Sequence, residues 1–377
     1  MMASVPSARV GAGVETIDTP ALVIDLDAME RNLRRMAEFA RAHGVALRPH
    51  AKMHKSVDLA RRQLAAGAVG VCVQKTAEAE VMADGGIDDI FLSNQVVSVS
   101  KLARVATVAH RLARRGGRLS IAVDSPLGIE LLSGAMAAVD IDIDVFVEID
   151  VGQGRCGVAP GEPALALARR IAAAPKLRFG GLQAYHGGAQ HVRAVQDRRE
   201  RIARVVAAVG RTQAVLAAAG LRAPLVTGAG TGTFALEAAS GVFGELQAGS
   251  YLFMDADYAL NERASDQPEF EHALFVKTQV VSVADDHAVC DAGHKAHAVD
   301  SGLPCVWQRE IEVVACSDEA ATLRGATLPQ LGEALWLIPG HCDPTVNLHD
   351  AMVGVRGGLA GGVVERIVNV DARGALS

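Results

Sequence analysis

The sequence has no excess of positive charge and no cysteine framework. Its 37 Lys and Arg residues stand against 43 Asp and Glu residues, so the net charge of -6 provides no basic field for nucleic acid or an anionic membrane. The six cysteines are scattered without a CxxC spacing, which is typical of a reduced cytoplasmic enzyme. We therefore expect a cytoplasmic protein that binds small molecules, with neither nucleic acid nor membrane among its partners.

The chain also lacks any segment suited to export or to membrane insertion. No stretch stays apolar and uncharged for the roughly 18 residues that a membrane span requires. Residues 1–17 contain no apolar core of a signal peptide. No repeat of solenoid period is present. At 377 residues, half of them hydrophobic, the chain suits two domains or one large barrel with an addition.

What the chain does contain is a regular alternation of short apolar runs and helical patterns. A strand expected at 21–25 precedes a helix that should extend to about Ala42, with Asp27 as its cap. Eight strands alternating with helices predict a parallel (β/α)8 TIM barrel, whose chemistry lies at the carboxyl ends of its strands. The eight predicted strands end near Lys52, Gln74, Asn94, Asp124, Asp150, Tyr185, Gly228 and Gly249.

After Tyr258 the pattern changes to strand-like runs with polar turns and little helix. A glycine-rich patch at 357–362 predicts a hairpin turn. We therefore predict a barrel domain over residues 26–258 and a β domain over 259–377, to which a strand at 18–25 is added. The expected strands of the β domain are 273–283, 288–291, 306–316, 334–338, 352–355 and 363–370.

The basic run LRPHAKMHK, from Leu47 to Lys55, lies where a strand-like pattern gives way to a helix. Lys52 at the end of that strand would be partly enclosed, which can lower the pKa of its amine enough for Schiff-base chemistry. The alternative is a solvated basic helix start, since lysines are mostly surface charges. The run by itself leaves both interpretations open.

Two turns after the seventh and eighth predicted strands have the composition of an anion site. The segment 227–233, TGAGTGT, offers backbone N–H groups and hydroxyls, and the segment 249–251, GSY, follows the next strand. Glycines two apart are also common in tight turns. In these barrels, however, the loops after strands seven and eight frequently bind phosphate, so the pair favours a phosphorylated ligand.

Isolated basic residues provide further candidates with two interpretations each. Arg155, in a glycine-flanked loop, could offer paired donors to a ligand or form a surface ion pair. His191, which follows His186 after the sixth strand, could act as a general base or cap the long helix that ends near Ala219. The cluster at 294–297, HKAH, could meet a substrate anion or form a solvated turn.

The segment PGHCDPTVNLHD contains a candidate metal pair. His341 and Asp343 stand two apart, so on an extended segment they can face the same way and share a divalent ion completed by water. The H-x-D spacing is a weak signal without context. We expect His349 and Asp350 to be supports or turn residues.

In combination these motifs resemble the fold-type III pyridoxal-phosphate enzymes of the D-threonine aldolase and D-3-hydroxyaspartate aldolase group, which are relatives of alanine racemase. The similarity extends from residues 18–20 to 372–374. The last motif discriminates, because aldolases have H-x-D where related D-serine dehydratases have a histidine and a cysteine. The motifs are RPHAKMHKS, VCVQK, VEIDVGQGRCGV, GLQAYHG, TGAGTGT, ELQAGSYLFMDADY, VDSGLP and PGHCDPTVNLHD.

The resemblance implies roles for the candidate residues. Lys52 would be the Schiff-base lysine, and His191 and Tyr185 would be further catalytic residues, with His191 as the base. Asp318 would line the substrate side, and His341 and Asp343 would bind a divalent metal such as Mn, Mg, Co or Zn. Pyridoxal 5'-phosphate (PLP) would be bound by Lys52, Gln74, Arg155, Tyr185, Gly228, Gly230, Thr231, Gly249, Ser250 and Tyr251, with Arg155 at its phenolic oxygen.

Two positions depart from the family pattern. Ala320 stands where the family usually has a histidine, so the family pattern does not predict the substrate side of this pocket. Ala229 stands where the glycine-rich loop often has glycine, which we expect to be a mild change. The resemblance also implies a homodimer in which the β domain of one subunit completes the barrel site of the other.

The expected activity is retro-aldol cleavage of a D-3-hydroxy amino acid, either D-3-hydroxyaspartate or D-threonine, to glycine plus glyoxylate or acetaldehyde. A D-serine or 3-hydroxyaspartate dehydratase of the same family is one alternative. A non-catalytic PLP carrier is another, although such carriers lack a segment like 260–377. The preferred side chain, the configuration at the 3-carbon and the native metal stay open.

Overall fold

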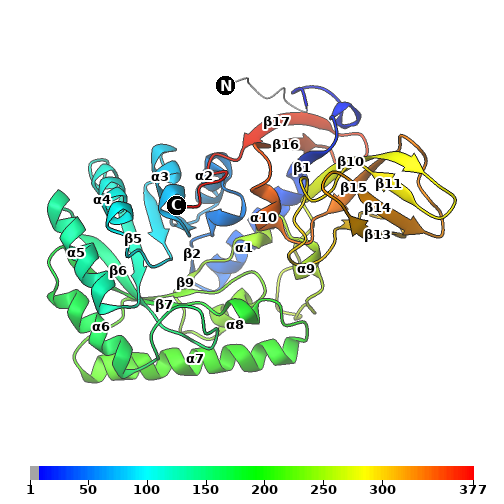
Figure 1. The fold of residues 1–377 in the computed structure, drawn as a ribbon. Coiled ribbons are helices and arrows are strands. Elements are labelled where there is room, and N and C mark those ends of the chain that lie inside the picture. The colour runs from blue at the N-terminus through cyan, green and yellow to red at the C-terminus, as the bar shows by residue number, and fades with distance from the viewer. Residues whose placement is uncertain (1–7) are drawn as a thin grey trace.

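A parallel barrel and an antiparallel-rich β sheet make up residues 8–377, the part of the chain that this computed structural model describes (Figure 1). The barrel strands pair in parallel in the order β2-β9-β8-β7-β6-β5-β4-β3, and a parallel bridge from His50 to Cys72 joins the two ends. The predicted fold class is therefore confirmed. The strands are β2 (Ala46–Leu47), β3 (Val71–Val73), β4 (Asp89–Leu92), β5 (Arg118–Val123), β6 (Ile143–Glu148), β7 (Leu177–Ala184), β8 (Leu225–Gly228) and β9 (Glu245–Leu246).

Helices follow the barrel strands and cover their outer face with apolar side chains, as parallel sheets require. The first helix is capped by Asp25, whose Oδ1 accepts from the N–H groups of Asp27 and Ala28 at 3.0 Å each. The expected cap, Asp27, is wrong, because the helix begins directly after the strand. The helices are α1 (Leu26–Ala42), α2 (Val57–Ala65), α3 (Thr76–Asp84), α4 (Val99–Ala113), α5 (Pro126–Val139), α6 (Glu162–Ala173), α7 (Val195–Ala218), α8 (Phe234–Ala239) and α9 (Ala256–Ala259).

The second sheet has nine strands in the order β11-β14-β13-β12-β15-β10-β1-β16-β17. Its β1 comes from the start of the chain and pairs antiparallel with β10 and parallel with β16. The glycine-rich patch 357–362 joins β16 to β17 as a hairpin. The strands are β1 (Ala21–Asp25), β10 (Leu274–Val283), β11 (Ala288–Cys290), β12 (Cys305–Val306), β13 (Ile311–Cys316), β14 (Ala321–Gly325), β15 (Ala334–Ile338), β16 (Ala351–Arg356) and β17 (Val363–Asn369).

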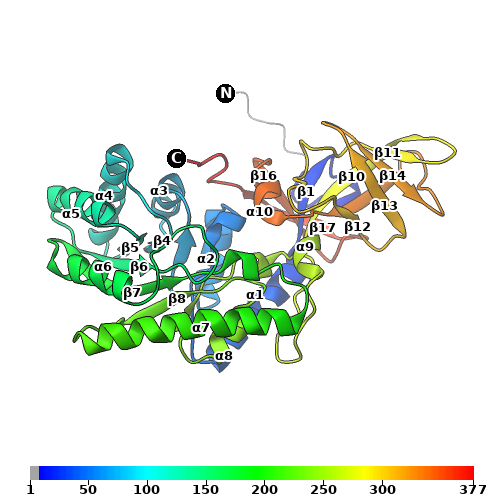
Figure 2. The same cartoon turned by 60° about the horizontal axis from the view of Figure 1, so that its bottom comes forward.

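Short helical turns connect the two parts of the fold. A small helix, α10 (Cys342–Val346), packs against the 3-10 turn η2 (Ala51–Met53) of the barrel. The other 3-10 turns are η1 (Val14–Thr16), η3 (Gly187–Ala189) and η4 (Ser250–Leu252). Figure 2 shows α9 and α10 at the junction between the barrel and the sheet. Among residues 8–377, the helices are all too short or too polar to cross a bilayer.

Backbone hydrogen bonds join the end of the barrel to the loop before α10. The N–H of Ala256 donates to the carbonyl of Pro339 at 3.0 Å, and the N–H of Asp257 donates to the carbonyl of Gly340 at 3.2 Å. The buried Asp255 carboxylate accepts from the N–H of Cys342 at 3.0 Å. The start of α10 is therefore held at the mouth of the barrel.

Candidate active site

Lys52 and Asp343 meet at this junction, although 291 positions separate them in the sequence. The distance from Lys52 Nζ to Asp343 Oδ2 is 3.1 Å, and the Lys52 side chain is 43% exposed. Lys52 lies in η2 and not at the end of a strand, because β2 ends at Leu47. The carboxylate of Asp343 raises the pKa of the Lys52 amine, and this effect exceeds the opposing effect of desolvation. The expected lowering of this pKa is therefore wrong for the arrangement observed.

Arg155 and Tyr185 form a neighbouring part of the rim. The Arg155 guanidinium lies over the Tyr185 ring, 5.6 Å from its centroid, and 3.9 Å from Glu148 Oε1. Burial raises the pKa of the Tyr185 hydroxyl, while the charges of Lys52 and Arg155 lower it. Tyr185 is therefore a neutral hydroxyl close to two cations.

His50 links the lysine turn to the next strand ends. Its Nε2 lies 3.3 Å from Gln74 Oε1 and 3.3 Å from Ser93 Oγ. Burial, followed by the positive charge of Lys52, lowers the pKa of His50 to about 3. The ring is therefore neutral at physiological pH. His50 therefore adds no charge next to Lys52, although the sequence placed it in a basic run.

The glycine-rich loop after β8 packs closely against its neighbours. A Cβ at Gly228 would lie 2.2 Å from the Ala184 carbonyl oxygen, and one at Gly230 would lie 2.5 Å from Gln190 Oε1. Thr231 Oγ1 accepts from the N–H of Tyr251 at 3.0 Å, which joins the two predicted phosphate turns. The N–H groups of Gly230, Thr231 and Ser250 find no acceptor within residues 8–377. These free donors fit an anion such as a phosphate.

Ala229 and Tyr251 differ from what the sequence predicted for these two turns. Ala229 has φ of +70°, in the left-handed region that disfavours residues with a Cβ by about 1–2 kcal/mol. The change from glycine to alanine therefore strains the backbone. The Tyr251 side chain is fully buried in the core, where its hydroxyl accepts from Gln63 Nε2 at 3.3 Å. Tyr251 can thus face a ligand only through its backbone.

His341 and Asp343, the predicted metal pair, lie side by side at the start of α10. His341 is extended and precedes α10, whereas Asp343 lies in its first turn, so the expected extended segment is wrong. His341 Nε2 lies 3.8 Å from Asp343 Oδ1, and this buried oxygen has no hydrogen-bond partner. Within residues 8–377, no group of three or more His, Cys, Asp or Glu side chains is suited to a metal. The pair therefore fits an ion that takes its remaining ligands from substrate or water.

His191 contacts a carboxylate and does not cap α7. Its Nδ1 lies 2.5 Å from Asp257 Oδ2, and its ring lies 5.2 Å from the Tyr258 ring. The residue before α7 is Ala194, which provides no side-chain cap, so the capping alternative is wrong. Arg193 binds the second oxygen of Asp257. Asp257 thereby orients the His191 ring and leaves Nε2 as its free nitrogen.

Asp318 lies apart from this group in the single chain. It is exposed in the turn between β13 and β14, where its carbonyl accepts from the N–H of Lys295 at 3.0 Å. Within the described residues, its carboxylate makes no hydrogen bond or ion pair with Lys52, Tyr185, His341 or Asp343. Its expected role at the substrate stays a prediction that requires a second subunit.

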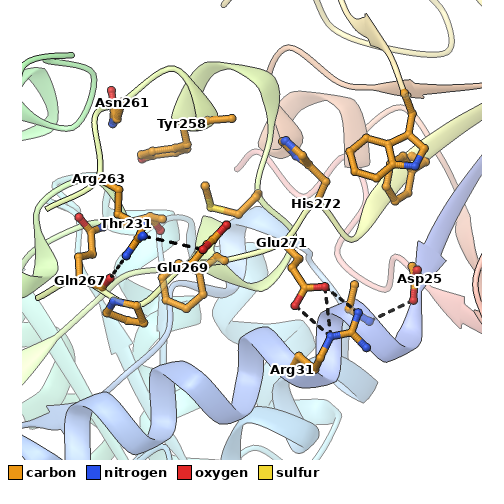
Figure 3. Close-up of a pocket in the computed structure, with 18 of the residues that line it drawn as sticks. Asp25, Arg31, Thr231, Tyr258, Asn261, Arg263, Gln267, Glu269, Glu271 and His272 are labelled. Atoms are coloured by element: carbon orange, nitrogen blue, oxygen red, sulfur yellow. Dashed lines mark hydrogen bonds and ion pairs between the residues drawn. The ribbon is translucent and has the colours of Figure 1, made fainter. Parts of the chain in front are cut away.

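A cavity of about 640 Å³ adjoins the glycine-rich loop (Figure 3). Thr231 and Tyr258 line one part of it, and the ion pair of Arg31 and Glu271 lines another. Its lining does not include Lys52, Arg155 or Asp343. The cavity therefore borders the candidate phosphate turn at Thr231, but its walls do not include the Lys52–Asp343 cluster.

Known proteins match the chain along almost its full length. The N-terminal domain of alanine racemase matches residues 24–257, and a serine dehydratase domain matches residues 273–355. A 3-hydroxy-D-aspartate aldolase of Paracoccus denitrificans (strain Pd 1222) is 45% identical over 97% of this chain and 94% of its own. A D-threonine aldolase of Arthrobacter sp is 45% identical over 98% of this chain and 96% of its own. The chain belongs to this aldolase family.

The crystal structure of D-threonine aldolase from Filomicrobium marinum is similar in fold to this chain, with a TM-score of 0.95. It is 48% identical and covers 98% of this chain and 100% of its own. A D-threo-3-hydroxyaspartate dehydratase of Delftia sp. (strain HT23) is more distant, at 32% identity over 88% of this chain and 92% of its own. The expected alanine racemase-like fold and the expected lyase class are confirmed, and PLP is the cofactor of such folds.

The sequence interpretation missed several residues that contact the candidate groups: His50, Asp257, Tyr258 and Asp300. Asp257 and Tyr258 end the motif ELQAGSYLFMDADY, and Asp300 is the second residue of the motif VDSGLP. A signal was therefore present in the motifs, but their partners lie far away in the chain. Only the folded chain brings Asp257 to His191 and Asp300 to His341.

Proposed function

We propose that this chain is a PLP- and divalent-metal-dependent aldolase that cleaves D-3-hydroxy amino acids to glycine and an aldehyde. The observation that carries the proposal is the 3.1 Å distance between Lys52 Nζ and Asp343 Oδ2. It brings the candidate cofactor lysine next to the candidate metal pair. Full-length similarity to aldolases of two substrate types supports the same reaction.

The residues that would hold PLP lie around the barrel rim. Lys52 would bind its aldehyde carbon, the free N–H groups of the 228–231 and 249–251 turns would bind its phosphate, and Arg155 would lie at its phenolic oxygen. When bound, PLP supplies an electron-accepting ring for cleavage of a bond to Cα. Tyr185 and Gln74 would complete the walls of the pocket.

The chain's own residues provide the acid and base groups. His341 and Asp343 would hold the metal, and a divalent ion bound there would supply Lewis-acid chemistry for the substrate 3-hydroxyl. His191, with Nδ1 bound to Asp257, presents Nε2 to accept the hydroxyl proton. Loss of that proton favours cleavage of the Cα–Cβ bond, which yields the aldehyde.

A dehydratase is the second candidate, because the Delftia dehydratase is 32% identical to this chain. Product analysis with D-threonine and D-3-hydroxyaspartate separates the two reactions. We expect glycine and an aldehyde in equal amounts. The aldehyde should be acetaldehyde from D-threonine and glyoxylate from D-3-hydroxyaspartate. Formation of ammonia and a keto acid without glycine would replace the aldolase proposal by the dehydratase. The relative rates with the two substrates identify the preferred side chain.

We further propose that the protein is a cytoplasmic homodimer. The exposed position of Asp318 supports a dimer, since within residues 8–377 its carboxylate contacts none of the other candidate site residues. We expect the site to accept Mg, Mn, Co or Zn, because a site with two protein ligands completed by water discriminates poorly among metals.

A further inference from the structure

The loop of residues 291–304, which precedes β12, packs along the segment 339–350 that contains His341 and Asp343. Thr345 Oγ1 accepts from the N–H of Ala298 at 3.1 Å and donates to the carbonyl of His341 at 2.7 Å. The His349 ring contacts the Ala296 carbonyl through Nε2 at 2.8 Å. Two contacts thereby connect the loop to the segment that contains His341 and Asp343.

Close backbone packing supports the same arrangement. A Cβ at Gly340 would lie 2.3 Å from the Gly302 carbonyl oxygen, so the two backbones approach closely where only glycine fits. On the other side, the N–H of Asp257 donates to the Gly340 carbonyl at 3.2 Å. The backbone before His341 is therefore held between the loop and the barrel.

The ring of His341 is oriented by a carboxylate of this loop. Asp300 Oδ2 lies 2.7 Å from His341 Nδ1, on the ring nitrogen that does not face Asp343. A carboxylate at Nδ1 makes this nitrogen the protonated donor and leaves the lone pair on Nε2. His341 Nε2 is the atom 3.8 Å from Asp343 Oδ1.

We propose that Asp300 is a positioning residue that sets the His341 ring for binding a divalent cation. The inference rests on the proposed metal site and names the residue that completes it. Carboxylates that bind the second nitrogen of a metal-binding histidine fix its tautomer and raise its basicity, and their loss typically weakens metal binding by about 10- to 100-fold. Asp300 contacts the ring from outside the site and does not bind the cation.

The chain contains a matched control pair. Asp286 Oδ1 lies 2.7 Å from His287 Nδ1, in an exposed turn between β10 and β11. The Asp300 and Asp286 side chains are 51% and 70% exposed, so neither substitution opens a cavity in the core. The two pairs have the same chemistry, but only one includes a candidate metal ligand.

The test is a titration of the metal-free, PLP-loaded protein with Mn²⁺, in which free Mn²⁺ is measured by electron paramagnetic resonance. We expect Asp300→Ala to weaken Mn²⁺ binding about 10- to 100-fold. Asp300→Asn should weaken it less, because its amide oxygen still accepts from Nδ1. Asp286→Ala should bind Mn²⁺ like the wild type, and the visible absorption of bound PLP should be the same in all variants.

Two results would overturn the inference in distinguishable ways. Equal Mn²⁺ affinity of the wild type, Asp300→Asn and Asp300→Ala would reject the role of Asp300 and leave the metal site intact. Absence of Mn²⁺ binding by the wild type would reject both the role and the proposed metal site. If Asp300→Ala fails to fold, unchanged affinity of Asp300→Asn rejects the role and weakened affinity supports it.

Discussion

At the scale of single residues, two neighbouring lysines have different surroundings. Lys52 is 43% exposed at the mouth of the barrel. Lys55 is buried, and its Nζ donates to Glu78 Oε1 at 2.6 Å and to the Ala372 carbonyl at 3.4 Å. Both lysines are in ion pairs, but that of Lys55 is buried in the fold, whereas Lys52 meets Asp343 at the accessible mouth of the barrel. Accessibility therefore favours Lys52 as the amine that a cofactor can reach.

We predict that Lys52→Ala abolishes the visible absorption of bound PLP and its attachment by borohydride reduction. Lys55→Met should instead destabilise the protein by about 3–5 kcal/mol, because it leaves Glu78 as a buried unpaired charge. Absorption spectra before and after reduction, with peptide mapping, measure the first effect. Attachment to the same peptide in Lys52→Ala would contradict the assignment.

Asp343 provides a second test at this scale. Asp343→Ala removes a candidate metal ligand but leaves the phosphate turns unchanged, so we predict loss of cleavage with PLP still bound. Chelation of the metal should have the same effect. Cleavage rate and visible absorption are measured in parallel on each sample. Unchanged turnover in protein shown to be metal-free by elemental analysis would contradict the metal-binding role of His341 and Asp343.

At the scale of elements, α8 supports the glycine-rich loop through a buried acid. Glu237 is 2% exposed, and its Oε1 accepts from Thr233 Oγ1 at 2.8 Å, whereas Oε2 has no partner. Burial raises the pKa of Glu237 from 4.5 to about 7. The proton therefore stabilises the folded chain: its contribution is complete below pH 4.5 and is lost as the pH rises through about 7.

We predict that Glu237→Gln makes the protein more stable than the wild type at pH 8, by about 1–3 kcal/mol. The neutral amide still accepts from Thr233 but never has to bury a charge. At pH 5 the difference should be small. Urea unfolding at the two pH values measures the difference in the free energy of unfolding between Glu237→Gln and the wild type. If this difference does not grow from pH 5 to pH 8, Glu237 is not a buried carboxyl that titrates near neutrality.

Short elements were the least predictable part of the fold. The sequence indicated the eight barrel strands through their buried residues and the polar residues that follow them. The first strand, however, ends at Leu47 and not near Lys52, and the last, β9, is only Glu245–Leu246. It did not indicate α10, whose five residues, CDPTV, are too few for a helical pattern. The strand β14 was missed for a related reason: its sequence, ATLRG, is short and its last two residues are exposed.

At the scale of the whole molecule, we predict a homodimer. Within residues 8–377 the exposed Asp318 carboxylate contacts none of the other candidate site residues, and Lys52 at the barrel mouth is 43% exposed. A second subunit over this mouth would exclude water from the substrate. Sedimentation at assay concentration should give a dimer, and Asp318→Ala should raise the KM for the substrate without changing PLP absorption. A fully active monomer would contradict this prediction.

The sequence by itself determined the parallel barrel, the β-rich second part and the types of residue at the strand ends, because apolar periodicity and glycine-rich turns are local properties of the chain. Tertiary structure decided which of these residues meet. Lys52 and Asp343, His191 and Asp257, and His341 and Asp300 are each brought together across 41 to 291 positions. The first pair depends on how the sheet packs on the barrel, and the other two depend on how distant loops fold together within the barrel and within the β domain. No local pattern therefore contains them. The pKa values of Lys52 and His50 depend on the same packing, because burial and neighbouring charge act through space.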